Sequence, residues 1–138
     1  MAATSLPSAL RVGVDLVQTS RVAESLATFG DRFLRRVFTE AEVAYAYAAD
    51  GDLALARLAA RFAAKEATVK ALDLAETGVG WREIEVTRGP SGAPGIMLHG
   101  SARAAAEAGG RAAPLLTVSL SHEGDYATAV VISLRGDS

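Results

Sequence analysis

The sequence predicts an α+β fold in which an antiparallel sheet packs on one long central helix. Alternation of apolar and polar residues predicts strands at residues 10–17 and 115–121, and a high content of β-branched residues predicts one at 126–134. Apolar residues at helical spacing predict a helix that follows Gly51 and runs to about Leu74. The 138 residues contain no internal repeat, so we expect one domain over residues 10–138, after a flexible Ala- and Ser-rich N-terminal tail at residues 1–9.

Composition excludes several classes of protein. Half of the residues are hydrophobic and 22% are charged, as in folded globular domains. The absence of cysteine removes disulfides, thiolate zinc sites and thiol nucleophiles, and fits a reducing compartment. No signal peptide or membrane-spanning run is present, so we expect a cytoplasmic protein without a membrane partner. A net charge of -2 argues against a nucleic-acid partner.

The first half of the chain alternates strand and helix signals. In the first strand, Val12, Val14 and Leu16 are predicted to face the core, with Asp15 on the opposite face near the strand end. Ser20 is the expected N-cap of a helix that closes at Gly30, and a short helical turn follows at 31–37. A Thr39 to Glu42 capping box then predicts a helix to Ala49.

The second half continues the pattern. A glycine-containing loop, residues 77–80, is followed by a hairpin with strands at 84–87 and 96–98. Ser101 is the expected N-cap of a short Ala-rich helix that stops at Gly109. The last two strands form a hairpin whose turn is EGD, residues 123–125, with His122 at its mouth.

A carboxylate interrupts the apolar stripe of the long helix. Glu66 lies between Phe62 and Val69 on one side, where an unpaired charge would be costly. The helix supplies cations on both edges of the stripe, Lys65 and Lys70. An ordinary half-buried ion pair between Glu66 and Lys70 explains this pattern by itself. A metal ion or a hydrogen-bond network explains it equally well.

The chemistry open to this chain is narrow. It has only two histidines, no nucleophile elbow, no Walker A sequence and no dinucleotide fingerprint. Asp15 and Glu66 remain as oxygen ligands of the kind that magnesium takes in proteins. The cations that accompany them are Arg61, Lys65, Lys70 and His122. These residues favour magnesium-assisted chemistry on a phosphate anhydride.

Three separated stretches together resemble one family, the holo-acyl-carrier-protein synthases, which are small single-domain 4'-phosphopantetheinyl transferases. The stretches are GVDL at residues 13–16 followed by Arg21, RFAAKEA at residues 61–67 followed by Lys70, and VSLSH at residues 118–122. The resemblance covers residues 12–132. It implies transfer of 4'-phosphopantetheine from coenzyme A to a serine of an apo acyl carrier protein, which releases adenosine 3',5'-bisphosphate. It also implies a role in fatty-acid or polyketide biosynthesis.

The resemblance also implies roles for single residues. Asp15 and Glu66 match magnesium ligands, and either Glu66 or a metal-bound water deprotonates the serine. Lys70 matches the residue that stabilises or protonates the leaving phosphate, so Asp15, Glu66 and Lys70 form the expected catalytic set. The residues that match the coenzyme A site are Arg61, Lys65, Gly78, Gly80, Ser121 and His122.

Two kinds of partner follow from the same resemblance. Family members of this size form homotrimers with the active site between subunits, so the side of one protomer that carries Asp15 and His122 is expected to meet the Glu66 helix of the next. Acidic carrier proteins dock on a basic helix, and Arg21, Arg32 and Arg36 match those positions. Solvated arginines with no partner are the alternative for this cluster.

Two other function classes stay open. One is a magnesium-dependent hydrolase of a nucleotide anhydride, which would release product without a carrier protein. The other is a non-catalytic nucleotide-binding or assembly module, for which Glu66→Gln would leave ligand affinity unchanged.

Overall fold

The structure is a computed structural model and describes residues 9–136. The predicted tail therefore lies outside the described residues, except for Ala9. The elements in chain order are β1 (Leu10–Gln18), α1 (Thr19–Phe29), α2 (Asp31–Val37), α3 (Glu40–Tyr47), α4 (Gly51–Leu72), β2 (Ile84–Arg88), β3 (Pro94–Leu98), α5 (Gly100–Ala106), β4 (Leu115–Glu123) and β5 (Tyr126–Leu134), with short 3-10 turns at Trp81–Glu83 and Ala108–Gly110.

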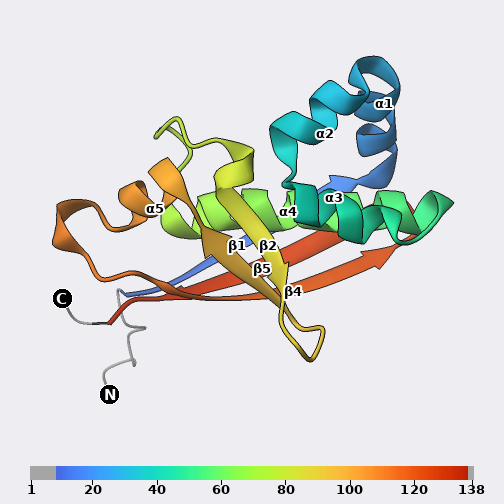
Figure 1. The fold of residues 1–138 in the computed structure, drawn as a ribbon. Helices are drawn as coiled ribbons and strands as arrows, with labels where there is room; N and C mark the ends of the chain where they lie inside the picture. The colour runs from blue at the N-terminus through green and yellow to red at the C-terminus, as the bar shows by residue number, and fades with distance from the viewer. Residues whose placement is uncertain (1–8, 137–138) are drawn as a thin grey trace.

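The strands form two antiparallel sheets. The larger sheet has the order β1-β5-β4, and β2 pairs with β3 in a separate hairpin. Figure 1 shows α4 lying along one face of the larger sheet, with α1 and α2 at one end and α5 at the other. The predicted α+β class, with a long helix on an antiparallel sheet, is confirmed. Within the described part of the chain, no helix combines the length and apolar character needed to cross a membrane.

Local sequence explains most element boundaries. The predicted capping box opens α3, because the Thr39 hydroxyl accepts from the Glu42 N–H at 3.2 Å and the Glu42 carboxylate accepts from the Thr39 N–H at 2.8 Å. The helix α4 ends at Leu72, since Asp73 takes a left-handed conformation at φ 56°. The two predicted serine caps were wrong, because Ser20 donates its hydroxyl to Asp125 and Ser101 donates to Glu83.

The face of β1 that points to the core is the opposite of the predicted one. Val12, Val14 and Leu16 are 64%, 56% and 63% exposed. Gly13 is buried and Asp15 is half-buried on the face that meets α4. A strand pattern of period two identifies two faces but not which of them is covered, and here the more apolar face is the open one.

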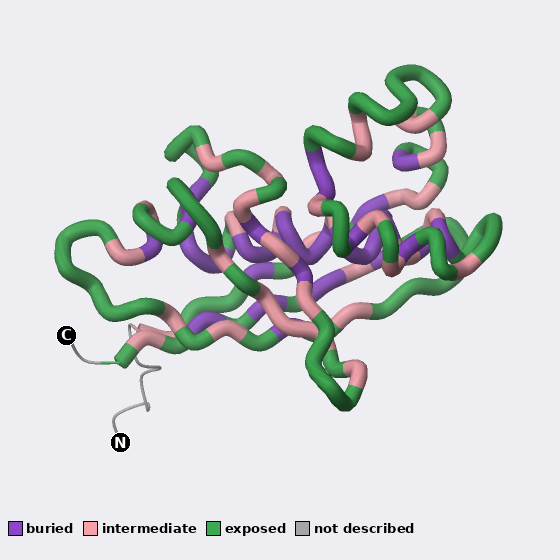
Figure 2. Tube along the Cα trace, in the orientation of Figure 1, coloured by how far each residue is buried: buried purple, intermediate pink, exposed green. Residues whose placement is uncertain are grey.

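Alanines carry the contact between α4 and the sheet. The helix buries Ala59, Ala63, Ala64 and Ala67 completely, whereas Phe62 of the predicted stripe is only half-buried. Figure 2 shows that burial concentrates where α4 meets the strands and is lower in α1 and α2. Small side chains let the helix axis approach the sheet closely, and this approach positions the candidate site.

Candidate active site

Asp15 and Lys70 join β1 to α4. The Lys70 ammonium donates to Asp15 Oδ1 at 2.8 Å and to the Val14 carbonyl at 3.1 Å. The Asp15 side chain is 11% exposed and the Lys70 side chain 57%. The hydrogen bond and the charge of Asp15 raise the pKa of Lys70. In the described chain Lys70 forms its ion pair with Asp15, so the ordinary Glu66 to Lys70 pair is not the arrangement found.

Glu66 belongs to the same group of side chains. The pKa of its carboxyl is raised from the ordinary 4.5 to about 7. Burial is the largest cause, the hydrogen bond to Asp15 and the charge of Asp15 add to it, and the charge of Lys70 opposes it. The two carboxyls therefore interact within one protomer. Asp15 was expected, with His122, to meet the Glu66 helix of the next subunit, but the contact of β1 with α4 already places it beside Glu66 of its own protomer.

The donor set fits a hard divalent cation. Asp15 Oδ2 is buried and has no hydrogen-bond partner among the described residues. A second carboxylate, Glu66, lies beside it, and both supply only oxygen. Magnesium needs one or two protein carboxylates and completes its shell with waters and substrate phosphates. Among the described residues no group of three or more His, Asp or Glu side chains could hold a metal ion.

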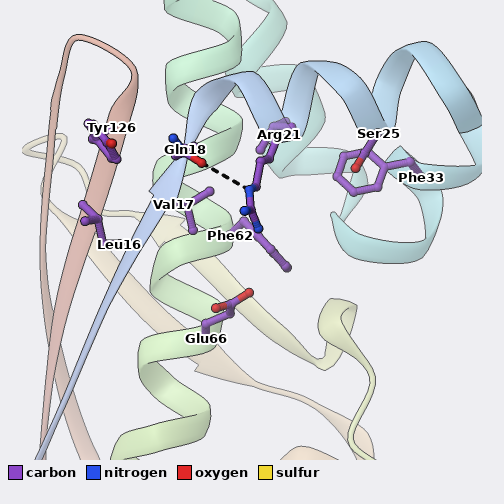
Figure 3. Close-up of a pocket in the computed structure, with 10 residues that line it drawn as sticks. Leu16, Val17, Gln18, Arg21, Ser25, Phe33, Phe62, Glu66 and Tyr126 are labelled. Carbon is purple, nitrogen blue, oxygen red and sulfur yellow. Dashed lines mark hydrogen bonds between the residues drawn. The ribbon is translucent and has the colours of Figure 1, made fainter.

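A cavity of about 580 Å³ opens beside Glu66. Figure 3 shows Glu66 of α4 and Arg21 of α1 pointing into the same space, with Phe62 between them. Arg21 is held by a 3.2 Å hydrogen bond from its Nε to Gln18. The Phe62 ring packs edge to face with Trp81, with 5.2 Å between the ring centroids, which fixes this wall of the cavity. The cavity has room for a phosphate-bearing ligand or an entering side chain beside the carboxylates.

Lys65 does not reach the site. Its ammonium is fully buried and donates to Glu42 at 2.7 Å, to the Trp81 carbonyl at 3.0 Å and to the Ile84 carbonyl at 2.6 Å. Burial lowers the pKa of Lys65, and the charge of Glu42 opposes that effect. All three ammonium protons of Lys65 are donated in hydrogen bonds to the protein itself. The predicted contact of Lys65 with coenzyme A was therefore wrong, and its role is structural.

A second, basic cavity of about 400 Å³ contains two other predicted ligand residues, Arg61 and His122. The Tyr45 ring forms its centre, because three guanidinium groups lie over this ring at 4.0 to 4.3 Å. The three groups belong to Arg57, Arg61 and Arg88. Three guanidinium groups around one cavity favour an anionic ligand.

The basic cavity also contains residues that sequence analysis missed. Arg57 precedes Arg61 by one helical turn, a spacing that signals a shared face. Nothing in the sequence signals Tyr45 or Arg88, since only the packing of α3 and the β2–β3 hairpin against α4 brings them there.

The two cavities lie at opposite edges of the larger sheet. The Glu66 cavity is lined by β1 residues, and the basic cavity by β4 residues. His122 of β4 is separated from Asp15 of β1 by β5, and Arg61 and Glu66, although both on α4, line different cavities.

The remaining predicted residues lie at the periphery. Ser121 lines a shallow hollow at the mouth of the β4–β5 hairpin, together with His122. Gly78 and Gly80 lie in the loop after α4, outside the residues that line the two cavities. Arg32 and Arg36 are exposed on α2, and Arg21 is exposed on α1. The structure thus brings together Asp15, Glu66 and Lys70, with Arg21 close by.

Comparison with known proteins identifies the family of this chain. Residues 11–131 match the family described as the 4'-phosphopantetheinyl transferase superfamily. A holo-[acyl-carrier-protein] synthase of Koribacter versatilis is 46% identical over 125 residues, which cover 89% of this chain and 96% of that protein. A second such synthase, from Herpetosiphon aurantiacus, is 44% identical, with 91% and 98% covered.

The fold is also similar to solved structures of holo-[acyl-carrier-protein] synthases. The ACPS–CoA complex of Chronobacterium ammoniagenes superimposes with a TM-score of 0.81 at 33% identity, covering 94% of this chain and all of that one. The Helicobacter pylori holo-[acyl-carrier-protein] synthase in complex with coenzyme A gives 0.73 at 27% identity, with 88% and 98% covered.

The fold is that of the holo-[acyl-carrier-protein] synthases of known structure, and the chain belongs to the 4'-phosphopantetheinyl transferase superfamily. Within that superfamily it groups with the holo-[acyl-carrier-protein] synthases, as the three motifs predicted.

Proposed function

We propose that this enzyme transfers 4'-phosphopantetheine from coenzyme A to a serine of an apo acyl carrier protein, with release of adenosine 3',5'-bisphosphate and with magnesium as cofactor. The observation that carries the proposal is the convergence of Asp15, Glu66 and Lys70 at one point in a chain of this family. In the proposed reaction the attacking hydroxyl arrives on the carrier protein, so the chain needs to supply the metal ligands and the cation but no nucleophile of its own.

Asp15 and Glu66 are the residues that would hold magnesium. The ion, when bound, neutralises charge that develops on the phosphate oxygens during transfer. Asp15 supplies its unpartnered Oδ2, and Glu66 supplies a carboxylate whose pKa is close to neutral in the metal-free protein. This group also suits acceptance of the proton of the attacking serine hydroxyl, by Glu66 itself or through a water that Glu66 orients.

Lys70 acts on the leaving group in this proposal. Its ammonium is held near the carboxylates by Asp15 and Val14 while the side chain stays half-exposed. A cation there stabilises the phosphate that departs with the nucleotide, and it can donate a proton to it.

The basic cavity is our candidate for the nucleotide end of coenzyme A, which carries a phosphate on its ribose. Arg57, Arg61, Arg88 and His122 surround it, and this cation density exceeds that around Glu66. Because the two cavities lie at opposite sheet edges, we propose that a complete site joins the basic cavity of one protomer to the carboxylates of the next.

A homotrimer is the assembly that we propose for this purpose. The open sheet face offers an apolar surface for it, and its most exposed large residues on β1 and at the start of β4 are Val12, Val14, Leu16 and Leu115. Exposed apolar area of this extent is typical of a protein–protein contact.

The carrier protein is proposed to dock on α1 and α2. Arg21 leads from this surface into the Glu66 cavity, and Arg32 and Arg36 are exposed beside it. An acidic partner would be steered to such a surface and oriented with its serine toward the cavity. We place the reaction in fatty-acid or polyketide assembly and in the cytoplasm, since a chain without cysteine fits a reducing compartment.

A transfer assay tests the proposal. The full chain is incubated with coenzyme A, magnesium and a panel of apo acyl carrier proteins, and carrier masses are measured. We expect a carrier to gain the mass of one phosphopantetheine group, only with magnesium. Glu66→Gln should abolish the gain, whereas the matched control Glu40→Gln, on an exposed carboxylate of α3, should preserve it.

The same assay separates the alternatives. No mass gain with any carrier, at any magnesium concentration, would overturn the transferase proposal. Release of nucleotide from coenzyme A without a carrier would identify a hydrolase instead. Coenzyme A binding that is unchanged in Glu66→Gln, with no turnover in either protein, would identify a non-catalytic binding module.

A further inference from the structure

Gly13 is the closest point between β1 and α4. An added Cβ would lie 1.9 Å from the Ala67 carbonyl oxygen, 2.8 Å from the Ala71 nitrogen and 2.9 Å from the Ala67 carbonyl carbon. All three atoms belong to the backbone of α4. No side-chain rotation on the helix can relieve such a clash, so any larger residue at this position must move the strand from the helix.

The backbone conformation of Gly13 does not itself require glycine. Its φ lies outside the left-handed region, unlike that of Gly30 or Gly78. It is paired regularly with Val131 of β5. The absence of a side chain therefore serves proximity and not a turn.

The candidate catalytic residues bracket this contact on both elements. Asp15 lies two residues after Gly13 on the same face of β1, and Glu66 directly precedes Ala67 on α4. The bonds from Lys70 to Asp15 and Val14, at 2.8 and 3.1 Å, cross the same gap. Moving the Cβ contact from 1.9 Å to an ordinary 3.4 Å would stretch these bonds beyond hydrogen-bond distance.

We propose that Gly13 is a positioning residue of this enzyme, whose missing side chain sets the spacing between β1 and α4 at which Asp15 and Glu66 reach one divalent cation. The inference rests on the proposed function, because the cation is part of it. Magnesium demands a nearly fixed distance to its oxygen ligands, so a displacement of the strand weakens binding of the cation, and manganese(II) takes the same oxygen ligands.

Manganese binding tests this role apart from turnover. Manganese(II) is titrated into the full chain with coenzyme A present, and free manganese is followed by electron paramagnetic resonance. We expect Gly13→Ala to weaken binding by about 10- to 100-fold, the usual effect of disturbing residues that orient metal ligands. The matched control is Gly89→Ala, since a Cβ there meets its nearest atom at an ordinary 3.7 Å.

A compensating change distinguishes positioning from general damage. Asp15→Glu lengthens the ligand by one methylene, so in the Gly13→Ala background it should recover part of the lost affinity, while alone it should weaken binding. Should Gly13→Ala fail to give a folded circular dichroism spectrum, Ala129→Val tests the same spacing. Ala129 is fully buried and pairs directly with Asp15, so its enlargement separates the strands from α4.

The outcomes are distinct. Manganese binding in folded Gly13→Ala equal to that of the unchanged protein, or no recovery by Asp15→Glu, overturns the positioning role and leaves the proposed function intact. An unchanged protein that binds no manganese with coenzyme A and modifies no carrier overturns the proposed function and this inference with it.

Discussion

Glu66 carries a carboxyl whose burial and carboxylate neighbour disfavour its charge. Its raised pKa means that, between pH 4.5 and about 7, the folded protein binds a proton that the unfolded chain has released. The free energy of unfolding of the metal-free protein should therefore fall as pH rises through this window. Denaturant unfolding at several pH values measures this. Glu66→Gln should flatten the slope and stabilise the protein at pH 7, and an equal slope in both proteins would contradict the raised pKa.

In the proposed mechanism Lys70 stabilises the negative charge that develops on the leaving phosphate. Lys70→Ala should reduce kcat more than it raises KM for coenzyme A, because the exposed ammonium contributes mainly in the transition state. Steady-state kinetics with coenzyme A varied at saturating carrier provide the measurement. A matched control is Arg82→Ala, an exposed cation outside both cavities. A rise in KM with kcat unchanged would assign Lys70 to substrate binding instead.

Candidate site residues were predictable from the sequence where the proposed phosphate chemistry requires a carboxylate or a cation. Asp15, Glu66 and Lys70 were identified from the motifs, and the structure joins them. Lys65 was misassigned because its counter-charge, Glu42, already had a role as a helix cap. The same carboxylate serves both purposes, accepting from Thr39 and from Lys65, and no sequence pattern reveals that it points inward.

The helix elements are held together by the buried pair of Lys65 and Glu42. Glu42 also accepts from the Val86 N–H at 2.8 Å, so the pair links α3, α4 and β2. Lys65→Met leaves Glu42 buried and unpaired, and should lower the free energy of unfolding by about 3–5 kcal/mol. Denaturant unfolding checks this. The double variant Lys65→Met with Glu42→Gln should recover part of the loss, and an undiminished loss would contradict the pairing argument.

Element types were easier to predict than the faces that elements bury. Alternation in β1 and the capping box of α3 each reflect local physics, so their positions were correct. The covered face of β1 depends on α4, which approaches through alanines and meets Gly13. Hydrophobicity alone predicted the wrong face, because the apolar side chains of Val12, Val14 and Leu16 are exposed on the face of the sheet that α4 does not cover.

At the scale of the whole molecule, the grouping of the predicted site residues was not predictable. The resemblance implied a site between subunits and put Asp15 and His122 on one side and Glu66 on the other. In the structure Asp15 of β1 lies with Glu66, whereas His122 of β4 lines the basic cavity, because β5 separates β1 from β4 and strand order is a property of the folded chain. Tyr45 and Arg88 joined the basic cavity for the same reason, through contacts between distant segments.

The open sheet face gives the last prediction, because the proposed trimer depends on it. Val14 is 56% exposed at the centre of the β1 edge, and a charge there would be desolvated in any contact with a second copy. Val14→Lys should therefore yield a monomer by analytical ultracentrifugation. It should also lose carrier modification while retaining manganese binding, since Asp15 and Glu66 belong to one protomer. Met97→Lys, a 51% exposed position on β3 away from that face, is the matched control and should keep both assembly and turnover. A Val14→Lys protein that is monomeric yet fully active would show that one protomer holds the complete site.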